Sequence, residues 1–319
     1  MASILRPRYL LIAGGTIVCL STVFGFFGRF FWFFDLFSHF RVQYAISLAL
    51  IGVPLILAKH YKTAAIFTSF ALVNLAVIAP LYFGNRALPE NSGPSIRAML
   101  LNVNTRFGDV ERVRQLITEV NPDILVLQEI NAKWVRDLEQ FKVAYPNSKV
   151  KPRSDNFGIG LFSKLPIVES EIAYIGDAEV PSILATVETE HGAIQIIATH
   201  PPPPAGAAYS QWRNNQLEEL ANYIPQNQPV ILIGDLNTTP WNYYFKQLLN
   251  QSKLIDSSQG RGVQATWPSK SPLLLIPLDH FLHSPDIFVT DKKIGGSAGS
   301  DHYSIIVDFS IDQKPIKEP

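Results

Sequence analysis

Two polar side chains at the end of a predicted strand are the clearest sign of chemistry in this sequence. The apolar run Pro229–Gly234 is followed by Asp235 and, two residues later, by Asn237. Alternate residues of a strand face the same side of a sheet, so both side chains are expected to project into one site. A carboxylate there can accept a proton or hold a cation, and an amide can hydrogen-bond an anionic oxygen. Because Gly-Asp-x-Asn is also a common turn composition, the motif alone does not establish a site.

Further polar residues follow other predicted strands in the same way. Each has an ordinary structural explanation when taken alone, such as a solvated loop carboxylate, a turn cap or a buried structural histidine. Their shared position at strand ends is much harder to explain by chance and indicates one polar site. These residues are Asn102, Asn104, Gln128, Glu129, His200, Asp279, Asp301 and His302.

Strand-like and helix-like segments alternate beyond residue 96 and must position these side chains. Short apolar stretches predict strands, apolar residues at helical spacing predict a helix capped by Asp109, and Glu190–Gly192 predicts a hairpin turn. Hairpins mixed with helical crossovers predict an α/β domain in which helices cover mixed sheets. The predicted helices span 110–120, 212–224 and 241–249, and the predicted strands span 97–103, 124–127, 158–162, 182–188, 193–199, 229–234 and 303–309.

The ordered set of motifs resembles the endonuclease/exonuclease/phosphatase superfamily, in a membrane-anchored member of bacterial type. The resemblance covers about residues 96–310 and implies a four-layer sandwich, in which two mixed β-sheets pack together with helices outside. Members include DNase I-like nucleases, abasic-site endonucleases, inositol polyphosphate phosphatases and neutral sphingomyelinases, so hydrolysis of a phosphoric ester is implied without a substrate. The motifs are Asn-Val-Asn (102–104), Leu-Gln-Glu (127–129), Thr-His (199–200), Gly-Asp-Leu-Asn (234–237), Leu-Asp-His-Phe (278–281) and Ser-Asp-His (300–302).

The resemblance implies a divalent-cation site. Glu129 matches the metal-binding glutamate of the family, Asn102 the asparagine beside it, and Asp301 is expected to add to the metal or to the environment of the neighbouring histidine. Oxygen ligands of this kind suit Mg²⁺, with Mn²⁺ as an alternative. The sequence offers no cysteine pair and no His-x-x-x-His spacing, which disfavours zinc. Asn104 is expected to contact the substrate.

The resemblance also implies the catalytic roles. Asp235 is expected to orient or deprotonate the attacking water, and Asn237 to hydrogen-bond a phosphate oxygen. His302 matches the essential histidine of the family, and Asp279 is expected to pair with its imidazole. His200 matches a second histidine of DNase I-like and sphingomyelinase-like members, and two histidines on opposite sides of a phosphodiester can serve as base and acid. Asp235 and His302 remain rival candidates for the general base.

One family feature has no clear counterpart in this chain. Many members place an aromatic residue or an arginine between the glutamate and the Thr-His motif. Tyr145 and Arg153 are the possible counterparts, although neither has a convincing local context. The identity of the residues that position the substrate in this region is therefore left undecided by the sequence.

The first 87 residues are predicted to form a membrane domain. Only seven Lys/Arg and two Asp/Glu occur in the first 90 residues. Runs without charge at 9–28, 42–58 and 63–84 have 20, 17 and 22 residues, close to the length that spans a bilayer. Three transmembrane helices are therefore predicted, with a buried soluble helical hairpin as the alternative. A breaker-rich linker at 88–95 and a catalytic domain at 96–319 follow.

Basic residues set the expected orientation in the membrane. The positive-inside tendency predicts a cytoplasmic N-terminus and an extracytoplasmic catalytic domain, in an integral protein of the bacterial inner membrane. A lipid bilayer is thus an expected partner, and the sequence indicates no protein partner. The residues that decide the orientation are Arg6, Arg8, Lys59 and Lys62 on one side against Arg29, Arg41 and Arg86 on the other.

Charge helps to rank the possible substrates. Residues 91–319 carry 20 Lys/Arg and 25 Asp/Glu, whereas nucleic-acid binding relies on basic surfaces. A local basic stretch between Lys142 and Lys164 could follow a phosphate backbone or face anionic lipid headgroups. We expect first a Mg²⁺-dependent endonuclease or exonuclease on DNA or RNA, and second a phosphodiesterase or phosphatase of phospholipids or small phosphate esters. A non-catalytic binding module is the third hypothesis.

Overall fold

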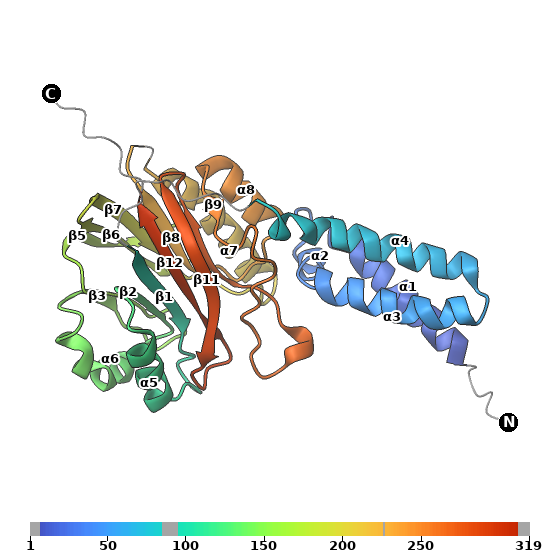
Figure 1. Cartoon of the computed structure of the whole chain (residues 1–319), viewed down its shortest axis with the longest axis horizontal. Helices are drawn as coiled ribbons and strands as arrows, with labels where there is room; N and C mark the ends of the chain where they lie inside the picture. The colour runs from blue at the N-terminus through green and yellow to red at the C-terminus, as the bar shows by residue number, and fades with distance from the viewer. Residues whose placement is uncertain (1–6, 85–94, 226, 312–319) are drawn as a thin grey trace.

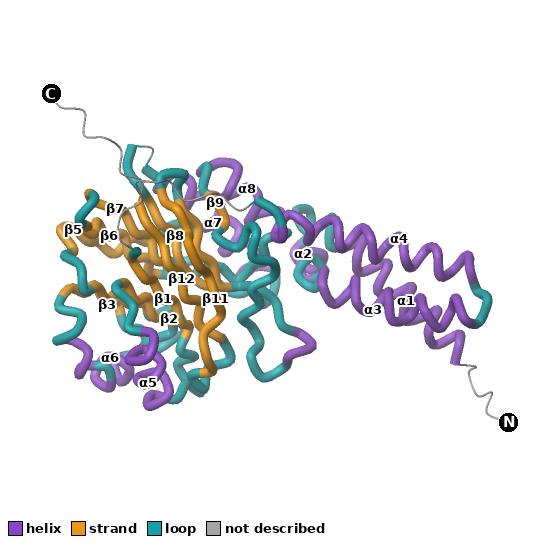
Figure 2. Tube along the Cα trace, in the orientation of Figure 1, coloured by secondary structure: helices purple, strands orange, loops and turns teal. Residues whose placement is uncertain are grey.

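Two six-stranded β-sheets packed face to face form the larger part of the molecule (Figures 1 and 2). The computed structural model describes residues 7–84, 95–225 and 227–311. The first sheet has the order β11 (Ile287–Ser297), β12 (Tyr303–Ile311), β1 (Ile96–Asn102), β2 (Ile124–Gln128), β4 (Ile159–Ser163) and β3 (Asn147–Lys151). The second has the order β5 (Ile167–Tyr174), β6 (Pro181–Thr189), β7 (Gly192–Ala198), β8 (Val230–Asp235), β10 (Asp279–His283) and β9 (Ile255–Asp256).

Apolar residues of both sheets fill the space between them. Leu100 and Val126 from the first sheet join Ile196, Ile231 and Phe281 from the second in one buried cluster. A second cluster joins the outer face of the first sheet to α5, and a third joins the outer face of the second sheet to α7 and α8. The predicted sandwich of two mixed sheets flanked by helices is therefore confirmed. The covering helices are α5 (Val110–Val120), α6 (Ala132–Asp137), α7 (Ala207–Leu220) and α8 (Tyr243–Ser252).

Local sequence signals account for several of these elements. α5 begins where expected because the Asp109 carboxylate accepts the backbone N–H groups of Glu111 and Arg112. α7 begins at Ala207, five residues before the predicted start. The prediction missed this first part of the helix because the residues before Trp212 show no apolar residues at helical spacing. The strands β3, β5, β9, β10 and β11 were not predicted. β3, β5 and β11 are partly exposed strands near sheet edges and do not form continuous apolar runs. β9 has only two residues, and three of the five residues of the buried β10 are polar, so neither forms an apolar run.

The functional residues gather because strand ends meet at the same edge of the sandwich. β1 and β2 run parallel with Asn102 opposite Gln128, and β7 runs parallel to β8. β10 runs antiparallel to β8 and places Asp279 opposite Asp235. The carboxyl ends of parallel strands lie together, so residues far apart in the chain converge here. The two sheets are also joined directly at this edge by Gln128.

Gln128 forms hydrogen bonds from the first sheet to the ends of two strands of the second, β7 and β8. Its Nε2 donates to the Thr199 carbonyl at 2.8 Å, and its Oε1 accepts the Asp235 backbone N–H at 2.9 Å. The backbones approach so closely that a Cβ at position 234 would lie 1.8 Å from the Thr199 oxygen. Glycine is therefore required at Gly234, and this contact fixes the position of the following carboxylate.

Three long helices and one short helix at the N-terminal end form an elongated bundle beside the sandwich (Figure 1). Leu48, Leu55 and Phe67 pack in its small interior, while Ile17 and Leu50 are more than half exposed. A short helix and its turn connect the first long helix to the second at the end nearest the sandwich. The bundle consists of α1 (Pro7–Phe24), α2 (Trp32–Leu36), α3 (Arg41–Leu57) and α4 (Tyr61–Ile78), followed by a 3₁₀ turn at Ala79–Tyr82.

The prediction of three full membrane spans is wrong in its lengths. Among the described residues, only Tyr61–Tyr82 is both long and apolar enough to cross a bilayer. The first apolar helix ends at Phe24 because the chain turns at Gly25, and the second ends at Leu57. The apolar helices Arg8–Phe24 and Arg41–Leu57 are therefore each only 17 residues long, including the arginine at the start. A helix of that length rises only about 26 Å. The predicted linker lies outside the described residues except for Ser95, as does the end of the predicted catalytic domain beyond Ile311.

A buried ion pair attaches this helical segment to the sandwich. Asp35 of α2 pairs with Arg213 of α7 at 2.5 Å, and the Asn242 amide donates to the same carboxylate. Burial alone would raise the pKa of Asp35, but hydrogen bonding from His39 and the charge of Arg213 hold that pKa well below its ordinary value. Both charged groups are fully buried, so each depends on the other for compensation. More hydrogen bonds join Gln43 to the Leu275 carbonyl and Gly262 to the Leu81 carbonyl.

Replacing Asp35 is expected to destabilise the full chain strongly. Asp35→Ala leaves the Arg213 guanidinium buried without its counter-charge, which typically costs about 3–5 kcal/mol. The measurement is the unfolding midpoint of the full chain in detergent. The double variant Asp35→Leu/Arg213→Met should recover most of the loss, and Glu139→Ala at an exposed ion pair should leave the midpoint unchanged. An Asp35→Ala midpoint equal to that of the unsubstituted chain would contradict this role.

Candidate active site

The strand-end residues line a cavity of about 720 Å³. Its lining includes six residues expected from the sequence, while Asn102, Asn104 and Asp279 contact these residues from behind. The remaining lining is largely apolar and aromatic, which is typical of sites that exclude water around a few polar groups. The six residues are Glu129, His200, Asp235, Asn237, Asp301 and His302.

A row of hydrogen-bonded and ion-paired groups crosses the floor of the cavity. His302 Nδ1 lies 2.9 Å from Asp279 Oδ2, and His302 Nε2 lies 3.6 Å from Asp235 Oδ2. His200 Nε2 approaches the same Asp235 oxygen from the other side at 3.4 Å. All four side chains are at least 95 % buried. The expected pairing of Asp279 with His302 is present, and Asp235 lies between two imidazoles.

The protonation states in this row follow from its charges. Burial alone would lower the pKa of His302, but the Asp279 and Asp235 carboxylates outweigh burial and raise that pKa to about 10. Burial also opposes the charged form of His200, and the hydrogen bond and charge of Asp235 raise its pKa overall. Conversely, burial would raise the pKa of Asp235, whereas the two imidazoles lower it to about 2. At neutral pH the row therefore holds an ionised Asp235 carboxylate beside the His302 imidazolium, and the same carboxylate favours the charged form of His200.

Asn102, at the end of β1, contacts one carboxylate from each sheet: Glu129 after β2 and Asp235 at the end of β8. Its Nδ2 lies 2.9 Å from Glu129 Oε1 and 3.3 Å from Asp235 Oδ2. The Asn102 amide oxygen accepts the backbone N–H of Asn104 at 3.0 Å. In this arrangement the Asn102 amide orients Glu129. The role of Asn102 as a metal ligand stays a prediction.

The donor set fits a hard divalent cation. Glu129 Oε1 and Oε2 each accept one hydrogen bond, from Asn102 and from the Thr105 backbone, which leaves lone pairs toward the cavity. Carboxylates of Asp235 and Asp301 line the same cavity. Mg²⁺ is usually bound through one or two carboxylates together with water and phosphate oxygens, so these residues suit it. Asp235, Asp279 and His302 also lie within 4.8 Å of one another, but their mutual hydrogen bonding and ion pairing make them a proton-holding row.

Asp301 is held in place by two neighbours. Its Oδ1 accepts the Asn104 amide at 2.7 Å, and its Oδ2 accepts the Trp267 indole N–H at 3.0 Å. Asn104 thus reaches the cavity through Asp301, and its predicted contact with substrate stays a prediction. The Trp267 ring also packs near the His302 imidazole.

Three site residues have a left-handed backbone. Asn104, Glu129 and Asn237 have φ of 54°, 60° and 49°. Residues other than glycine rarely adopt this region, and such strain concentrates at functional sites. Asn237 is pinned by its backbone N–H on Asp235 Oδ1 and by its side-chain amide on the Pro201 carbonyl, both at 2.9 Å. The predicted contact of Asn237 with a phosphate oxygen stays a prediction.

Several lining residues were missed from the sequence. Arg106 lies on the cavity wall, whereas Tyr145 bonds the Pro122 carbonyl in the core and Arg153 pairs with Asp155. Arg106 follows the Asn-Val-Asn motif by two residues, and that spacing was the signal available. The other missed lining residues include Phe157, Tyr209, Trp267 and three from the N-terminal segment, Leu36, His39 and Phe40.

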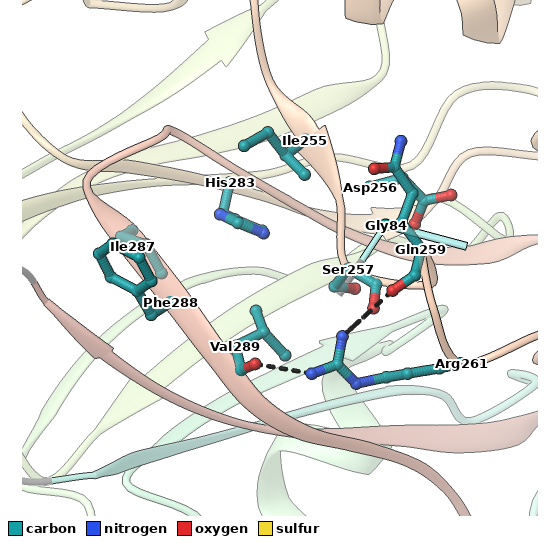
Figure 3. Close-up of a pocket in the computed structure, with 10 residues that line it drawn as sticks. All are labelled: Gly84, Ile255, Asp256, Ser257, Gln259, Arg261, His283, Ile287, Phe288 and Val289. Atoms are coloured by element: carbon teal, nitrogen blue, oxygen red, sulfur yellow. Dashed lines mark hydrogen bonds between the residues drawn. The ribbon is translucent and has the colours of Figure 1, made fainter. Parts of the chain in front are cut away.

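A second, much smaller cavity lies beside β9 and β11, away from these groups (Figure 3). Its volume is about 20 Å³, which suits a single water molecule. Arg261 crosses it and donates to the carbonyls of Ser257 and Val289. His283 lines this cavity and bonds the Ser284 carbonyl, so it belongs to the packing of the sheet edge.

Solved structures share the fold of the sandwich. D. rerio TDP2, complexed with a single-strand DNA product, superposes with a TM-score of 0.57 at 20% identity, covering 68% of this chain and 99% of that chain. The human Nocturnin catalytic domain with bound sulfate gives 0.55 at 22% identity, covering 68% and 95%. Sphingomyelinase C from Streptomyces griseocarneus gives 0.51 at 18% identity, covering 68% and 99%. At identities this low, the structural similarity shows a common fold and nothing about the substrate.

Comparison of the sequence itself gives the family. A search of curated proteins found no significant match. The model of the Endonuclease/Exonuclease/phosphatase family matches residues 99–302, which is more than half of the chain and includes all the strand-end motifs from Asn102 to His302. The chain therefore belongs to the endonuclease/exonuclease/phosphatase family.

Proposed function

We propose that this chain is a Mg²⁺-dependent phosphodiesterase held at a membrane by its N-terminal helices. The observation that carries the proposal is the row Asp279–His302–Asp235–His200 beside the Glu129 carboxylate in one cavity. Such a row can hold and move protons next to a cation site, as hydrolysis of a phosphoric ester requires. Family membership supports this reaction class.

Glu129 would hold the cation, assisted by Asn102 and Asp301. When bound there, Mg²⁺ would neutralise charge on the phosphate and polarise the phosphoryl group. Mn²⁺ offers the same ligand preference and is the alternative ion.

The protein residues would handle water and protons. Asp235 is ionised, so it accepts a hydrogen bond from the attacking water and orients it, while His302 is charged and stabilises the phosphoryl oxygens. His200 contacts the same carboxylate and donates a hydrogen bond to the phosphoryl group when it is protonated. The water oxygen forms a bond to phosphorus and one P–O ester bond breaks. The proton lost by water passes to the carboxylate row, and an imidazolium supplies a proton to the leaving oxygen. Of the two rival bases, Asp235 is favoured because His302 already carries its proton.

The N-terminal helices would anchor the chain in the inner membrane of a bacterium. Tyr61–Tyr82 supports this with a full span, and the two shorter apolar helices pack beside it. Arg41 is 98 % buried and donates to the Thr22 carbonyl and to Asn74, so it links α3 to α1 and α4 inside the bundle. The positive-inside tendency still favours an extracytoplasmic catalytic domain, since Arg6, Arg8, Lys59 and Lys62 would face the cytoplasm against Arg29, Arg41 and Arg86 on the other side.

Nucleic acid is one candidate substrate for this phosphodiesterase, which would make the chain a nuclease. The solved D. rerio TDP2 structure holds a single-strand DNA product, and the nuclease expectation from the motifs applies equally here. Among the described lining residues, Arg106 is the one Lys or Arg of the cavity, whereas a polynucleotide usually contacts several cations. Cleavage of supercoiled plasmid with Mg²⁺, and its loss with EDTA, would establish the nuclease.

Hydrolysis should depend on the row and on the cation. With bis(p-nitrophenyl) phosphate and Mg²⁺, Asp235→Asn and His302→Ala should each lower kcat/KM by about 10²–10⁴-fold, because proton transfer or charge stabilisation is lost. EDTA should abolish the activity. The control is His191→Ala, in the hairpin turn between β6 and β7, which should retain it. Full activity in both folded site variants would refute the proposal.

Glu129 should govern Mg²⁺ affinity. Glu129→Gln removes the ligand charge while keeping the side-chain size, so Mg²⁺ binding measured by isothermal titration calorimetry should weaken by at least about tenfold. Glu171→Gln, on the partly exposed strand β5, serves as the control and should bind normally. Equal affinity in the Glu129 variant would place the cation elsewhere.

His302 should remain charged at neutral pH without metal. Its pKa of about 10 lies above the ordinary 6.5, so the imidazolium persists at pH 8 and is lost only as the pH rises through about 10. Burial lowers the pKa of His280, which should therefore stay neutral at pH 6.5. Histidine ¹⁵N chemical shifts of the metal-free chain, assigned with His302→Gln and His280→Gln, measure both. A neutral His302 ring at pH 8 would contradict the charged row.

A further inference from the structure

The N-terminal segment forms one wall of the catalytic cavity. Leu36, His39 and Phe40, from the end of α2 and the turn into α3, line the same cavity as Asp235 and His302. The family match begins only at residue 99, so this wall is an addition to the catalytic domain that the family shares. The cavity is incomplete without the segment that leads into the apolar helices.

Buried polar contacts hold this wall against the catalytic loop. Arg213, which pairs with Asp35, also donates to the Asn237 carbonyl at 3.1 Å. His39 Nδ1 lies 3.2 Å from Thr239 Oγ1, two residues further along the same loop. Because these groups are buried, the wall has a fixed position relative to the site.

The same end of the molecule exposes apolar and aromatic side chains. The loop that contains Leu273 and Leu274 is drawn in orange on the side of the sandwich nearest the bundle, and these residues are 87 % and 51 % exposed (Figure 1). Gln43 of α3 ties this loop to the helices through the Leu275 carbonyl at 2.8 Å. Aromatic residues concentrate at the headgroup level of bilayers. The exposed aromatic residues between α1 and α2, and in α2, are Phe26, Phe27, Phe30, Phe31 and Phe33.

A bilayer around the helices would therefore lie against the cavity. The aromatic turn and the Leu273–Leu274 tip would sit in its interface, and the wall of Leu36 and Phe40 would connect that interface to the catalytic groups. Leu278 and Ile276 add to the apolar lining of the same cavity. An apolar path beside a phosphate-binding site suits an amphiphile.

We propose that the substrate is a phospholipid taken directly from the bilayer in which the helices are anchored. Its phosphodiester would reach Glu129 and the histidine row, while its acyl chains would lie along Leu36 and Phe40. One water molecule is consumed: its oxygen bonds to phosphorus, one P–O ester bond breaks, and the leaving oxygen takes up a proton. This inference rests on the proposed phosphodiesterase function and adds the substrate class and the residues that recognise it.

The test uses the full chain reconstituted with Mg²⁺ in vesicles of phosphatidylcholine, phosphatidylethanolamine, phosphatidylglycerol and sphingomyelin. Mass spectrometry of the lipids and the released headgroups measures cleavage, and bis(p-nitrophenyl) phosphate measures water-soluble diester hydrolysis in the same preparation. Wild type should cleave at least one vesicle lipid. In Leu36→Ala/Phe40→Ala, the ratio of lipid kcat/KM to soluble-diester kcat/KM should fall by roughly tenfold, as expected when apolar substrate contacts are removed.

Leu57→Ala is the matched control, since it truncates an exposed apolar side chain at the other end of α3 and should leave that ratio unchanged. Soluble-diester hydrolysis without lipid cleavage, or an unchanged ratio in the Leu36/Phe40 variant, would overturn the lipid proposal and leave the phosphodiesterase standing. Plasmid cleavage without lipid cleavage would overturn it in favour of nucleic acid. Failure to hydrolyse any of these phosphodiesters by folded, Mg²⁺-loaded protein would overturn both.

Discussion

The burial of the Asp235 carboxylate is the constraint around which the site is built. It lies at the seam of the two sheets with 1 % of its surface exposed, and a carboxylate removed from water needs compensating charge and hydrogen bonds. Its compensation comes from the imidazoles of His200 and His302, the Asn102 amide and the Asn237 backbone N–H. These partners come from both sheets, so the position of one carboxylate depends on the packing of the whole sandwich. The same compensation keeps Asp235 ionised and His302 charged and favours the charged form of His200, which is the state that the proposed chemistry uses.

Much of the catalytic half was accessible from sequence because its signals are local. Polar residues directly after apolar runs, such as Glu129 and Asp235, mark the carboxyl ends of strands, and parallel pairing brings such ends together. The layered fold follows from the same alternation of strands and helices. The edge strands escaped notice because partly exposed strands lack continuous apolar runs. The spacing of Arg106 from Asn104 was a weak signal, and the structure was needed to show that Arg106 lines the cavity.

The contribution of the N-terminal segment could not be read from the sequence. His39 lies among phenylalanines near a predicted membrane boundary, which suggests an interfacial residue, yet it is 96 % buried and contacts Thr239, 200 residues away. No local pattern encodes such a contact. Asp35 is likewise a single acidic residue in an apolar stretch, and the sequence does not show that it pairs with Arg213. Since Arg213 also bonds the Asn237 carbonyl, anchoring and active-site geometry share one buried network, and neither can be altered alone.

The most direct test of the central claim follows the oxygen atom of the attacking water. Bis(p-nitrophenyl) phosphate would be hydrolysed by the full chain with Mg²⁺ in H₂¹⁸O, and both products analysed by mass spectrometry. Attack of water on phosphorus at the Asp235–His302 site predicts one ¹⁸O in the p-nitrophenyl phosphate and none in the p-nitrophenol. Label in the phenol, or no product from folded, Mg²⁺-loaded protein, would contradict a phosphodiesterase that activates water at this site.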